Sequence, residues 1–228
     1  MYKLIAFDAY GTLFDVYSIG QLAETIYPTK GKQLTELWRE RQIEYTRLVT
    51  ISDPNPTGSQ YYLSFWEITT RALRYTCKRL GLSLSLEKEE QLMSQYAKLA
   101  AFSESLEVLK GLQAAGIKSA ILSNGSQEML ATAVESNQLA PYLDQIISVA
   151  DARLFKTAPQ TYKLLLDQFQ VSKQEVLFVS SNAWDVVGAG WFGFDTFWVN
   201  RQAHPFEEIG NQPTYEATSL IALLQKIA

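Results

Sequence analysis

The chain has 228 residues, 47% of them hydrophobic and 19% charged, and this composition excludes an intrinsically disordered protein. The net charge of −4 argues against non-specific binding to nucleic acid, which requires a basic surface. With one cysteine, Cys77, and one histidine, His204, the chain can form neither an internal disulfide nor a zinc site of Cys and His ligands. A Ser-His-Asp or Cys-His pair would need His204, so we expect acid–base chemistry to use carboxylates, lysine or tyrosine.

The N-terminal segment carries Asp8 inside its apolar stretch and shows neither the cationic region nor the cleavage site of a signal peptide. No run of about 18 apolar residues follows anywhere in the chain. We therefore expect a cytoplasmic protein with no membrane partner.

The first predicted element is a short buried strand, residues 4–7, which ends at Asp8. Helical spacing predicts helices over residues 36–49, 65–82 and 86–100, whereas residues 52–60 are rich in Pro, Gly, Asn and Ser and predict a loop. On the first of these helices, Leu37, Ile43 and Leu48 are expected to share one face. Residues 16–100 contain no predicted strand.

After residue 102, strands and helices alternate. The predicted helices cover residues 103–116, 127–139, 159–171, 184–193 and 219–228, and the predicted strands cover residues 119–122, 144–151, 175–182 and 196–200. This alternation predicts an α/β fold with a Rossmann-like, doubly wound parallel sheet. We expect a core domain of residues 1–15 plus 101–228, with an all-helical cap domain of residues 16–100 inserted after the first strand.

Polar side chains follow four of the predicted strands. They are Asp8, Tyr10 and Thr12 after the first, Ser123 and Asn124 after the second, Lys156 after the third, and Ser180, Ser181, Asn182 and Asp185 after the fourth. In open α/β sheets, ligands bind at the carboxyl ends of the strands, so these side chains are expected to share one rim. A buried, unpaired carboxylate is costly, and a lysine beside Asp8 would keep it ionised and able to act as a nucleophile. Taken singly, Ser123 and Asn124 are equally compatible with a helix cap.

The motifs FDAYGTLFD, ILSNGS, FK and VSSNAWD, in this order, resemble the haloacid dehalogenase superfamily and, more narrowly, the type II L-2-haloacid dehalogenases. The resemblance extends over nearly the whole chain, including the segments LWRERQIEYTRL and FGFDTFWVNR. It implies a HAD-like fold with a helical cap, a small 2-haloacid substrate, a halide product and a homodimer.

Magnesium-dependent phosphatases of the same superfamily carry a second aspartate two residues after the nucleophile and an acidic residue four before the last aspartate of the motif set. Here these positions hold Tyr10 and Ser181. Because Mg²⁺ needs carboxylate ligands and a departing halide needs no proton, we expect a dehalogenase with no metal and no cofactor. Two alternatives stay open, a small-molecule phosphatase of the same superfamily and a non-catalytic protein that binds a small ligand.

The resemblance also implies a reaction and its residues. Asp8 would attack C2 of an (S)-2-haloalkanoic acid, and water would hydrolyse the resulting ester to an (R)-2-hydroxy acid with inversion at C2. Haloacetates, including fluoroacetate, fall within the expected substrate range. The implied catalytic residues are Asp8, Thr12, Lys156, Ser180, Asn182 and Asp185, and the implied substrate-binding residues are Tyr10, Arg39, Ile43, Phe65, Ser123, Asn124, Tyr162 and Trp184.

Within these sets, Ser123 is expected to hold the substrate carboxylate, and Arg39 and Asn124 to stabilise the departing halide. Thr12, Ser180 and Asn182 are expected to orient Asp8 and to bind the ester carbonyl oxygen. Either Lys156 or Asp185 would activate the water. Without the resemblance, Ile43, Phe65 and Trp184 would be interpreted as core residues, and Arg39 as an exposed helix charge.

Overall fold

The computed structural model of the protein describes residues 2–53 and 55–227. Residues 1 and 228, at the ends of the predicted core domain, and residue 54 of the predicted loop lie outside the described residues. None of the helices in the described part of the chain combines the length and the apolar character needed to cross a membrane.

One parallel sheet forms the centre of the molecule. Its strands are β1 (Leu4–Phe7), β2 (Lys118–Ser123), β3 (Gln145–Ser148), β4 (Val176–Ser180), β5 (Asp195–Val199) and β6 (Tyr215–Ala217). They lie in the order β3-β2-β1-β4-β5-β6, and all neighbouring pairs are parallel. The predicted α/β, Rossmann-like fold is therefore confirmed. β6 was not predicted, because its three residues are partly exposed and lack the apolar run that marks the other strands.

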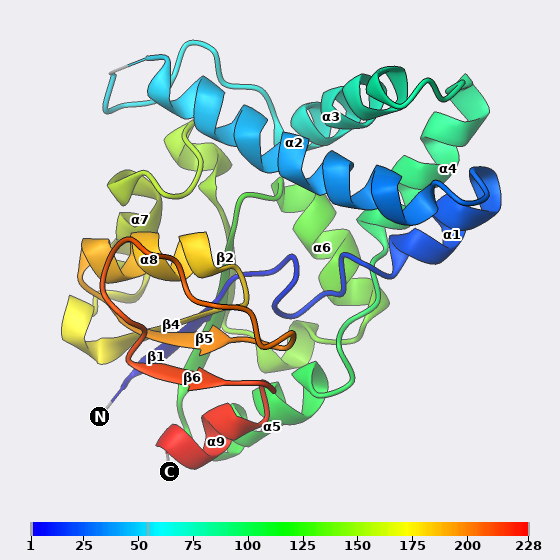
Figure 1. The fold of residues 1–228 in the computed structure, drawn as a ribbon. Helices are drawn as coiled ribbons and strands as arrows, with labels where there is room; N and C mark the ends of the chain where they lie inside the picture. Colours follow the sequence, from blue (N-terminus) through cyan, green and yellow to red (C-terminus); the bar gives the residue numbers. More distant parts are fainter. Residues whose placement is uncertain (1, 54, 228) are drawn as a thin grey trace.

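Nine α-helices and three short 3₁₀ helices accompany the sheet in the described residues. They are α1 (Ile19–Ile26), α2 (Gly31–Ile51), α3 (Phe65–Arg79), α4 (Leu86–Ala97), α5 (Ser105–Ala114), α6 (Gln127–Ser136), η1 (Ala140–Tyr142), η2 (Val149–Ala152), α7 (Pro159–Phe169), η3 (Lys173–Glu175), α8 (Ala183–Phe192) and α9 (Ala222–Ile227). Helices α5 and α9 pack together on one side of the sheet, and α7 and α8 pack together on the other (Figure 1). These helices bury both faces of the sheet, which explains why β1 and β4 are apolar at nearly every position.

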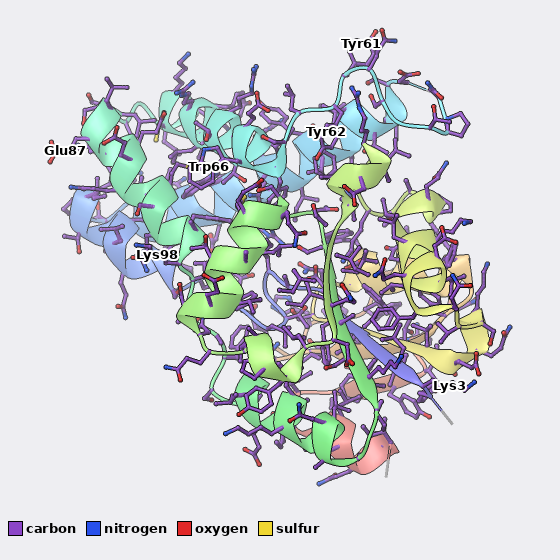
Figure 2. All side chains as sticks on the ribbon, turned by 180° about the vertical axis from the view of Figure 1, so that it is seen from behind. Lys3, Tyr61, Tyr62, Trp66, Glu87 and Lys98 are labelled. Atoms are coloured by element: carbon purple, nitrogen blue, oxygen red, sulfur yellow. The ribbon has the colours of Figure 1, made fainter. Side chains whose placement is uncertain are left out.

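Helices α1–α4 follow β1 and gather at one end of the molecule (Figure 1). Lys3, at the amino end of β1, lies on the opposite side of the molecule from Glu87 on α4 (Figure 2). This places the four helices beyond the carboxyl ends of the strands. Local signals support them: α3 begins with a reciprocal capping box between Ser64 and Glu67, which satisfies two backbone N–H groups at the helix start. Helix α1 was not predicted.

The buried face of α2 differs from the predicted one. Leu48, expected to be buried, is 45% exposed, and the buried stripe contains Leu34, Trp38, Gln42 and Thr46 instead. These four residues are spaced by four, as one face of a helix requires. The prediction of this face was wrong because two of its members are polar, and hydrophobic periodicity does not register a polar side chain buried with a hydrogen-bond partner.

The order of the strands fixes where a ligand can bind. The chain leaves β1 for β2 on one side and later returns to place β4 on the other side of β1. The carboxyl ends of β1 and β4 therefore flank the topological switch point of the sheet, which is the usual ligand site of this architecture. Asp8 follows β1 and Asn182 follows β4, so the two residues meet at this point.

Candidate active site

Asp8 lies at the centre of the switch point. It is 5% exposed, and its backbone N–H donates to Val179 O at 2.9 Å, which extends the pairing of β1 with β4. Its carboxylate oxygen Oδ2 accepts hydrogen bonds from Asn182 Nδ2 at 2.7 Å and from Thr12 Oγ1 at 3.2 Å. Oδ1 lies 3.2 Å from Lys156 Nζ. The two oxygens thus differ, since Oδ2 has two neutral donors and Oδ1 has one cationic donor.

Lys156 lies between two aspartates. Its Nζ is 3.2 Å from Asp8 Oδ1 and 2.9 Å from Asp185 Oδ2, and its side chain is fully buried. Phe178 of β4 lies beneath the ammonium, with its ring centroid 4.9 Å from Nζ. A buried ammonium is stable only when it is paired, so the two carboxylates stabilise the charged lysine at the rim. The ammonium in turn reduces the repulsion between the two carboxylates.

Asp185 lies in the first turn of α8 and is completely buried. Burial raises the pKa of its carboxyl group to about 6, and this effect outweighs the opposing influence of the Lys156 ammonium. Tyr162 of α7 donates its hydroxyl to Asp185 Oδ1 at 2.7 Å. Burial, together with the adjacent Asp185 carboxylate, raises the pKa of the Tyr162 phenol well above its usual value, so this hydroxyl stays a donor.

The loop after β1 has a conformation that depends on glycine. Gly11 has a φ of +92°, a backbone conformation that residues other than glycine rarely adopt. The loop then returns so that Thr12 Oγ1 accepts from the backbone N–H of Ser181 at 2.9 Å. On the β4 side, Ser180 Oγ accepts from the backbone N–H of Asn182 at 3.1 Å. Ser180 therefore reaches Asp8 through Asn182, whereas Thr12 touches the carboxylate itself.

Arg201 also supports this loop and was not selected from the sequence. Its guanidinium donates to Thr12 O at 3.1 Å and to Gly11 O at 3.3 Å, and it pairs with Glu104 at 3.0 Å. It lies over the ring of Phe102, 3.8 Å from the ring centroid. The segment FGFDTFWVNR contains Arg201, but its contacts with the loop are to backbone carbonyls, which any residue supplies, so no sequence motif points to them.

A small cavity opens beside Asp8, with room for about one water-sized sphere. It is lined by Asp8, Tyr10, Arg39, Ile43, Thr46, Phe65, Ser123, Asn124 and Trp184. Eight of these nine residues were selected from the sequence, and they come from both the strand ends and the helices α2 and α3. Thr46 was missed. Tyr162 lies outside the lining and contacts Asp185 instead.

Arg39 of α2 spans the gap between the helices and the strand ends. Its Nη1 donates to Gln42 Oε1 at 2.7 Å, and its Nη2 lies 3.4 Å from both Tyr10 O and Asn182 Oδ1. Asn124 has a positioning contact of its own, because its Oδ1 accepts from the backbone N–H of Lys156 at 3.0 Å. Arg39 thus reaches the cavity from α2, whereas Asn124 fixes the backbone of the segment that carries Lys156.

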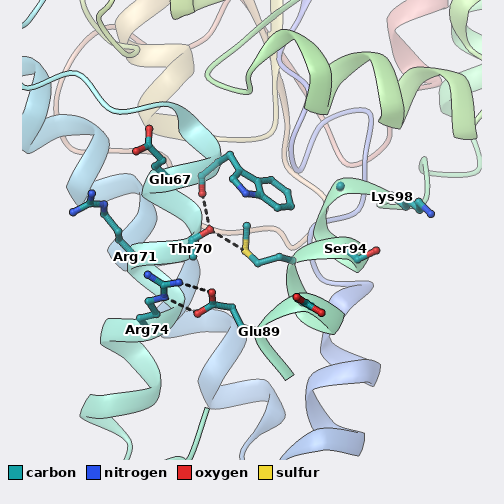
Figure 3. Close-up of a pocket in the computed structure, with 11 residues that line it drawn as sticks. Glu67, Thr70, Arg71, Arg74, Glu89, Ser94 and Lys98 are labelled. Carbon is teal, nitrogen blue, oxygen red and sulfur yellow. Dashed lines mark hydrogen bonds and ion pairs between the residues drawn. The ribbon is translucent and has the colours of Figure 1, made fainter. Parts of the chain in front are cut away.

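A larger groove lies elsewhere, between α3 and α4. It has a volume of about 830 Å³, and its lining includes Trp66, Thr70, Met93 and the ion pair of Arg74 with Glu89 (Figure 3). The pair is bidentate, with both contacts at 2.6 Å; the Arg74 side chain is exposed and that of Glu89 is half-buried. Size would favour this groove, or the groove of about 880 Å³ lined by residues of α1 and α2 with His204, over the small cavity as a binding site. The chemistry favours the small cavity, because the buried carboxylate of Asp8, which contacts Lys156, lies there.

The donor set around Asp8 does not fit the magnesium site of the related phosphatases. The carboxylates of Asp8 and Asp185 both contact an ammonium, and Ser181 supplies only a hydroxyl, which donates to Gly11 O. Mg²⁺ requires several oxygen ligands of high charge density. In residues 2–53 and 55–227, no three His, Cys, Asp or Glu side chains come together as a metal-binding group.

The fold and the site define a class of protein: an α/β enzyme with a Rossmann-like sheet and an aspartate–lysine–aspartate centre at the switch point. A family model described as haloacid dehalogenase-like hydrolase matches residues 2–193, so the chain belongs to that family. This confirms the resemblance found in the sequence motifs.

One relative and two solved structures within this family are similar to the chain over nearly its whole length. The chain is 40% identical over 223 residues to an (S)-2-haloacid dehalogenase from Pseudomonas sp. (strain YL), covering 98% of this chain and 93% of the relative. The crystal structure of the L-2-haloacid dehalogenase RSc1362 is 45% identical, with a TM-score of 0.96 and coverage of 99% and 98%. An L-2-haloacid dehalogenase from Xanthobacter autotrophicus with chloropropionic acid covalently bound is 33% identical, with a TM-score of 0.90 and coverage of 100% and 98%.

Proposed function

We propose that this protein is a hydrolytic dehalogenase that converts (S)-2-haloalkanoic acids to (R)-2-hydroxy acids and halide. One observation carries the proposal: the carboxylate of Asp8 lies in a cavity lined almost entirely by the residues that the dehalogenase motifs selected. Arg39 and Lys156 supply positive charge at this cavity, as an anionic substrate and an anionic leaving group require.

In the first step, Asp8 Oδ1 attacks C2 of the substrate from the face opposite the halogen. The O–C2 bond forms while the C2–halogen bond breaks, and the bonding electron pair leaves with the halide. Oδ1 is assigned to the attack because it accepts a single hydrogen bond, from Lys156 at 3.2 Å. Oδ2, held by Asn182 and Thr12, becomes the carbonyl oxygen of the ester.

In the second step, water attacks the Cγ carbon of Asp8 and the ester hydrolyses. Negative charge then develops on Oδ2, where the Asn182 amide and the Thr12 hydroxyl already donate, so the two donors stabilise it without reorganisation. Asp185, held by Lys156 at 2.9 Å, takes a proton from the attacking water. Collapse of the tetrahedral species breaks the Cγ–Oδ1 bond, and the departing Oδ1 takes up that proton from Asp185 to give the hydroxyl group of the 2-hydroxy acid. The second proton of the water passes to solvent, so Asp8 is again a carboxylate and now carries the oxygen of water. Because C2 is attacked once, its configuration inverts.

Substrate binding is assigned to the remaining lining residues. Ser123 and the backbone N–H groups after Asp8 hold the substrate carboxylate, and Arg39 with Asn124 stabilises the departing halide. Ile43, Phe65 and Trp184 provide the apolar wall that accommodates the alkyl chain and excludes water. Haloacetates, including fluoroacetate, belong to the proposed range, as the resemblance of the motifs implies.

The proposal includes the wider organisation of the protein. We assign residues 1–15 plus 101–228 to a core domain and residues 16–100 to a cap domain, a division supported by α1–α4, which lie within the latter range.

A cytoplasmic homodimer is also proposed. Tyr61, 53% exposed, points away from the molecule (Figure 2) and is an aromatic side chain that a second copy could cover. Sedimentation velocity that gives only monomer at micromolar concentration would contradict the dimer.

The decisive experiment measures halide release from (S)- and (R)-2-chloropropionate, with Asp8→Asn as the matched inactive variant. Wild-type protein is expected to act on the S enantiomer, to give R-lactate, and to remain active in EDTA. In a single turnover in H₂¹⁸O, the label is expected in Asp8 and not in the product. Release of phosphate from p-nitrophenyl phosphate with Mg²⁺, and no halide from any haloacid, would favour the phosphatase alternative.

A further inference from the structure

Gln42 contacts the guanidinium of Arg39 from inside the helical segment. Its side chain is 1% exposed, and its Oε1 accepts from Arg39 Nη1 at 2.7 Å, the shortest of the contacts that hold the arginine. Gln42 lies one position before Ile43, yet it does not line the cavity beside Asp8. A buried amide that faces a cavity-lining arginine is placed to orient that arginine.

A buried network fixes Gln42 in turn. Its Oε1 also accepts from the Tyr96 hydroxyl at 3.2 Å, and its Nε2 donates to Thr69 Oγ1 at 2.6 Å. The Thr69 hydroxyl donates to Phe65 O at 2.6 Å, and Thr69 O accepts from the indole N–H of Trp38 at 2.8 Å. Helices α2, α3 and α4 therefore all contribute to holding one amide, whose rotation is blocked because each of its groups has a partner.

The partner of Arg39 is neutral, and this has a chemical consequence. All three acceptors of the guanidinium, Gln42 Oε1, Tyr10 O and Asn182 Oδ1, are uncharged oxygens. A glutamate at position 42 would hold the arginine equally well but would cancel its charge. An amide orients the cation and leaves its full charge for an anion in the cavity.

We propose that Gln42 is a positioning residue for Arg39, holding the guanidinium where a halide departs without neutralising it. This inference rests on the proposed dehalogenase function for its catalytic meaning. The orientation of Arg39 for a monovalent anion can be tested by chloride binding alone, without any catalysed reaction. Preorganised donors lower the cost of reorganisation in the reaction, so the loss of Gln42 should affect kcat more than KM.

The test compares Gln42→Leu, which removes the acceptor, with Gln42→Glu, which keeps an acceptor but adds a charge. Tyr96→Phe removes one supporting hydroxyl, and Cys77→Ala is a control that perturbs a buried site of α3. Two properties are measured: halide release from (S)-2-chloropropionate, and chloride binding by ³⁵Cl NMR line broadening. Gln42→Leu is expected to lose about 10- to 100-fold in kcat, because a hydrogen bond to a charged group is worth this factor. Gln42→Glu is expected to lose activity as well, because its carboxylate neutralises Arg39. Both variants should broaden the chloride signal less than wild type. Tyr96→Phe is expected to show a smaller loss, and Cys77→Ala none.

A double-mutant cycle separates positioning from general destabilisation. If Gln42 acts through Arg39, Gln42→Leu adds little further loss when Arg39 is already alanine. Equal losses in both backgrounds, or wild-type kcat and chloride broadening in Gln42→Leu and Gln42→Glu, would overturn the inference and leave the dehalogenase function intact. Chloride broadening that depends on Gln42, with no halide from any haloacid, would support the inference and overturn the proposed function. A wild-type protein that neither binds chloride nor releases halide would overturn both.

Discussion

The ammonium of Lys156 lies 2.9 Å from Asp185 Oδ2, and both side chains are completely buried. Burial raises the pKa of Asp185 to about 6 although a cation is adjacent, because desolvation is the larger effect. A carboxyl group with this pKa is ionised at pH 7 and is a stronger base than an exposed aspartate. That combination suits a general base whose pKa lies near the working pH.

Replacing Asp185 by asparagine should separate the two steps of the proposed reaction. Attack by Asp8 does not need a base, so the ester is expected to form and then to persist, with kcat reduced about 10²- to 10⁴-fold. Intact-protein mass spectrometry after mixing with (S)-2-chloropropionate should show the added acyl mass, located at Asp8 by peptide mapping. Asp167→Asn is the matched control, because Asp167 also pairs with a lysine, Lys163, but on an exposed helix surface. An Asp185→Asn protein that turns over normally would remove this residue from the mechanism.

The pH dependence follows from the same carboxyl group. As pH falls through about 6, Asp185 takes up a proton and ceases to act as a base, so kcat is expected to fall about tenfold per pH unit below that value. The rate of ester formation in a single turnover should not fall in this way at low pH, because attack by Asp8 needs no base. A kcat profile that is flat between pH 5 and 7, with ester hydrolysis limiting, would contradict the assignment.

The free energy of unfolding should depend on pH in the opposite direction to kcat. The pKa of Asp185 is raised from 3.8 to about 6 on folding, so the folded state binds this proton more tightly than the unfolded state. The stabilisation from that proton is present below pH 3.8 and is lost as pH rises through about 6. Thermal melts of wild type and Asp185→Asn should therefore diverge across this window and run parallel above it.

Much of the site could be predicted because its residues occupy strand ends. A parallel sheet brings the carboxyl ends of its strands to one rim, so Asp8 and Asn182 were expected there from the strand pattern. The roles of these residues and of Lys156 came from the resemblance of the motifs. A lysine was expected beside Asp8, whereas its second contact, with Asp185, was not predicted. The hydrogen bond from the Tyr162 hydroxyl to Asp185 depends on how α7 packs against α8, which no local pattern encodes.

Two of the missed residues, Gln42 and Arg201, are polar groups whose partners are distant in the chain. Gln42 contacts Thr69 and Tyr96, and Arg201 contacts the loop at Gly11, more than 180 residues earlier. Hydrophobic periodicity describes which side chains avoid water, and it says nothing about a polar side chain whose burial depends on a tertiary hydrogen bond. The same limit explains why the buried face of α2 was assigned incorrectly.

The donors to Asp8 Oδ2 should be more important for rate than for folding. Asn182→Ala removes the 2.7 Å donor and is expected to lower kcat about 10²- to 10³-fold, as losses of a single oxyanion donor do. Thr12→Val removes the longer contact of 3.2 Å and should cost less. Steady-state kinetics with circular dichroism as a folding check would measure this, and exposed Asn211→Ala is the control. If Asn182→Ala retained most of the wild-type kcat, the proposed stabilisation of the ester oxygen would be wrong.

Gly11→Ala should reveal how closely the position of Asp8 depends on the backbone of its loop. A Cβ atom at Gly11 would have Ser181 Oγ as its nearest neighbour at 3.4 Å, so the side chain itself fits. The φ of +92° is the obstacle, and forcing alanine into it is expected to cost about 1–2 kcal/mol in the free energy of unfolding. A loop that relaxes instead would move Thr12 and Asp8, and a shift of about 1 Å is enough to reduce kcat about 100-fold.

Gly20→Ala is the control, because its Cβ meets no atom within 4 Å and its φ is not positive. Urea denaturation and halide release should show a loss in one or both properties for Gly11→Ala and in neither for Gly20→Ala; an unaffected Gly11→Ala protein would show that the loop tolerates another conformation.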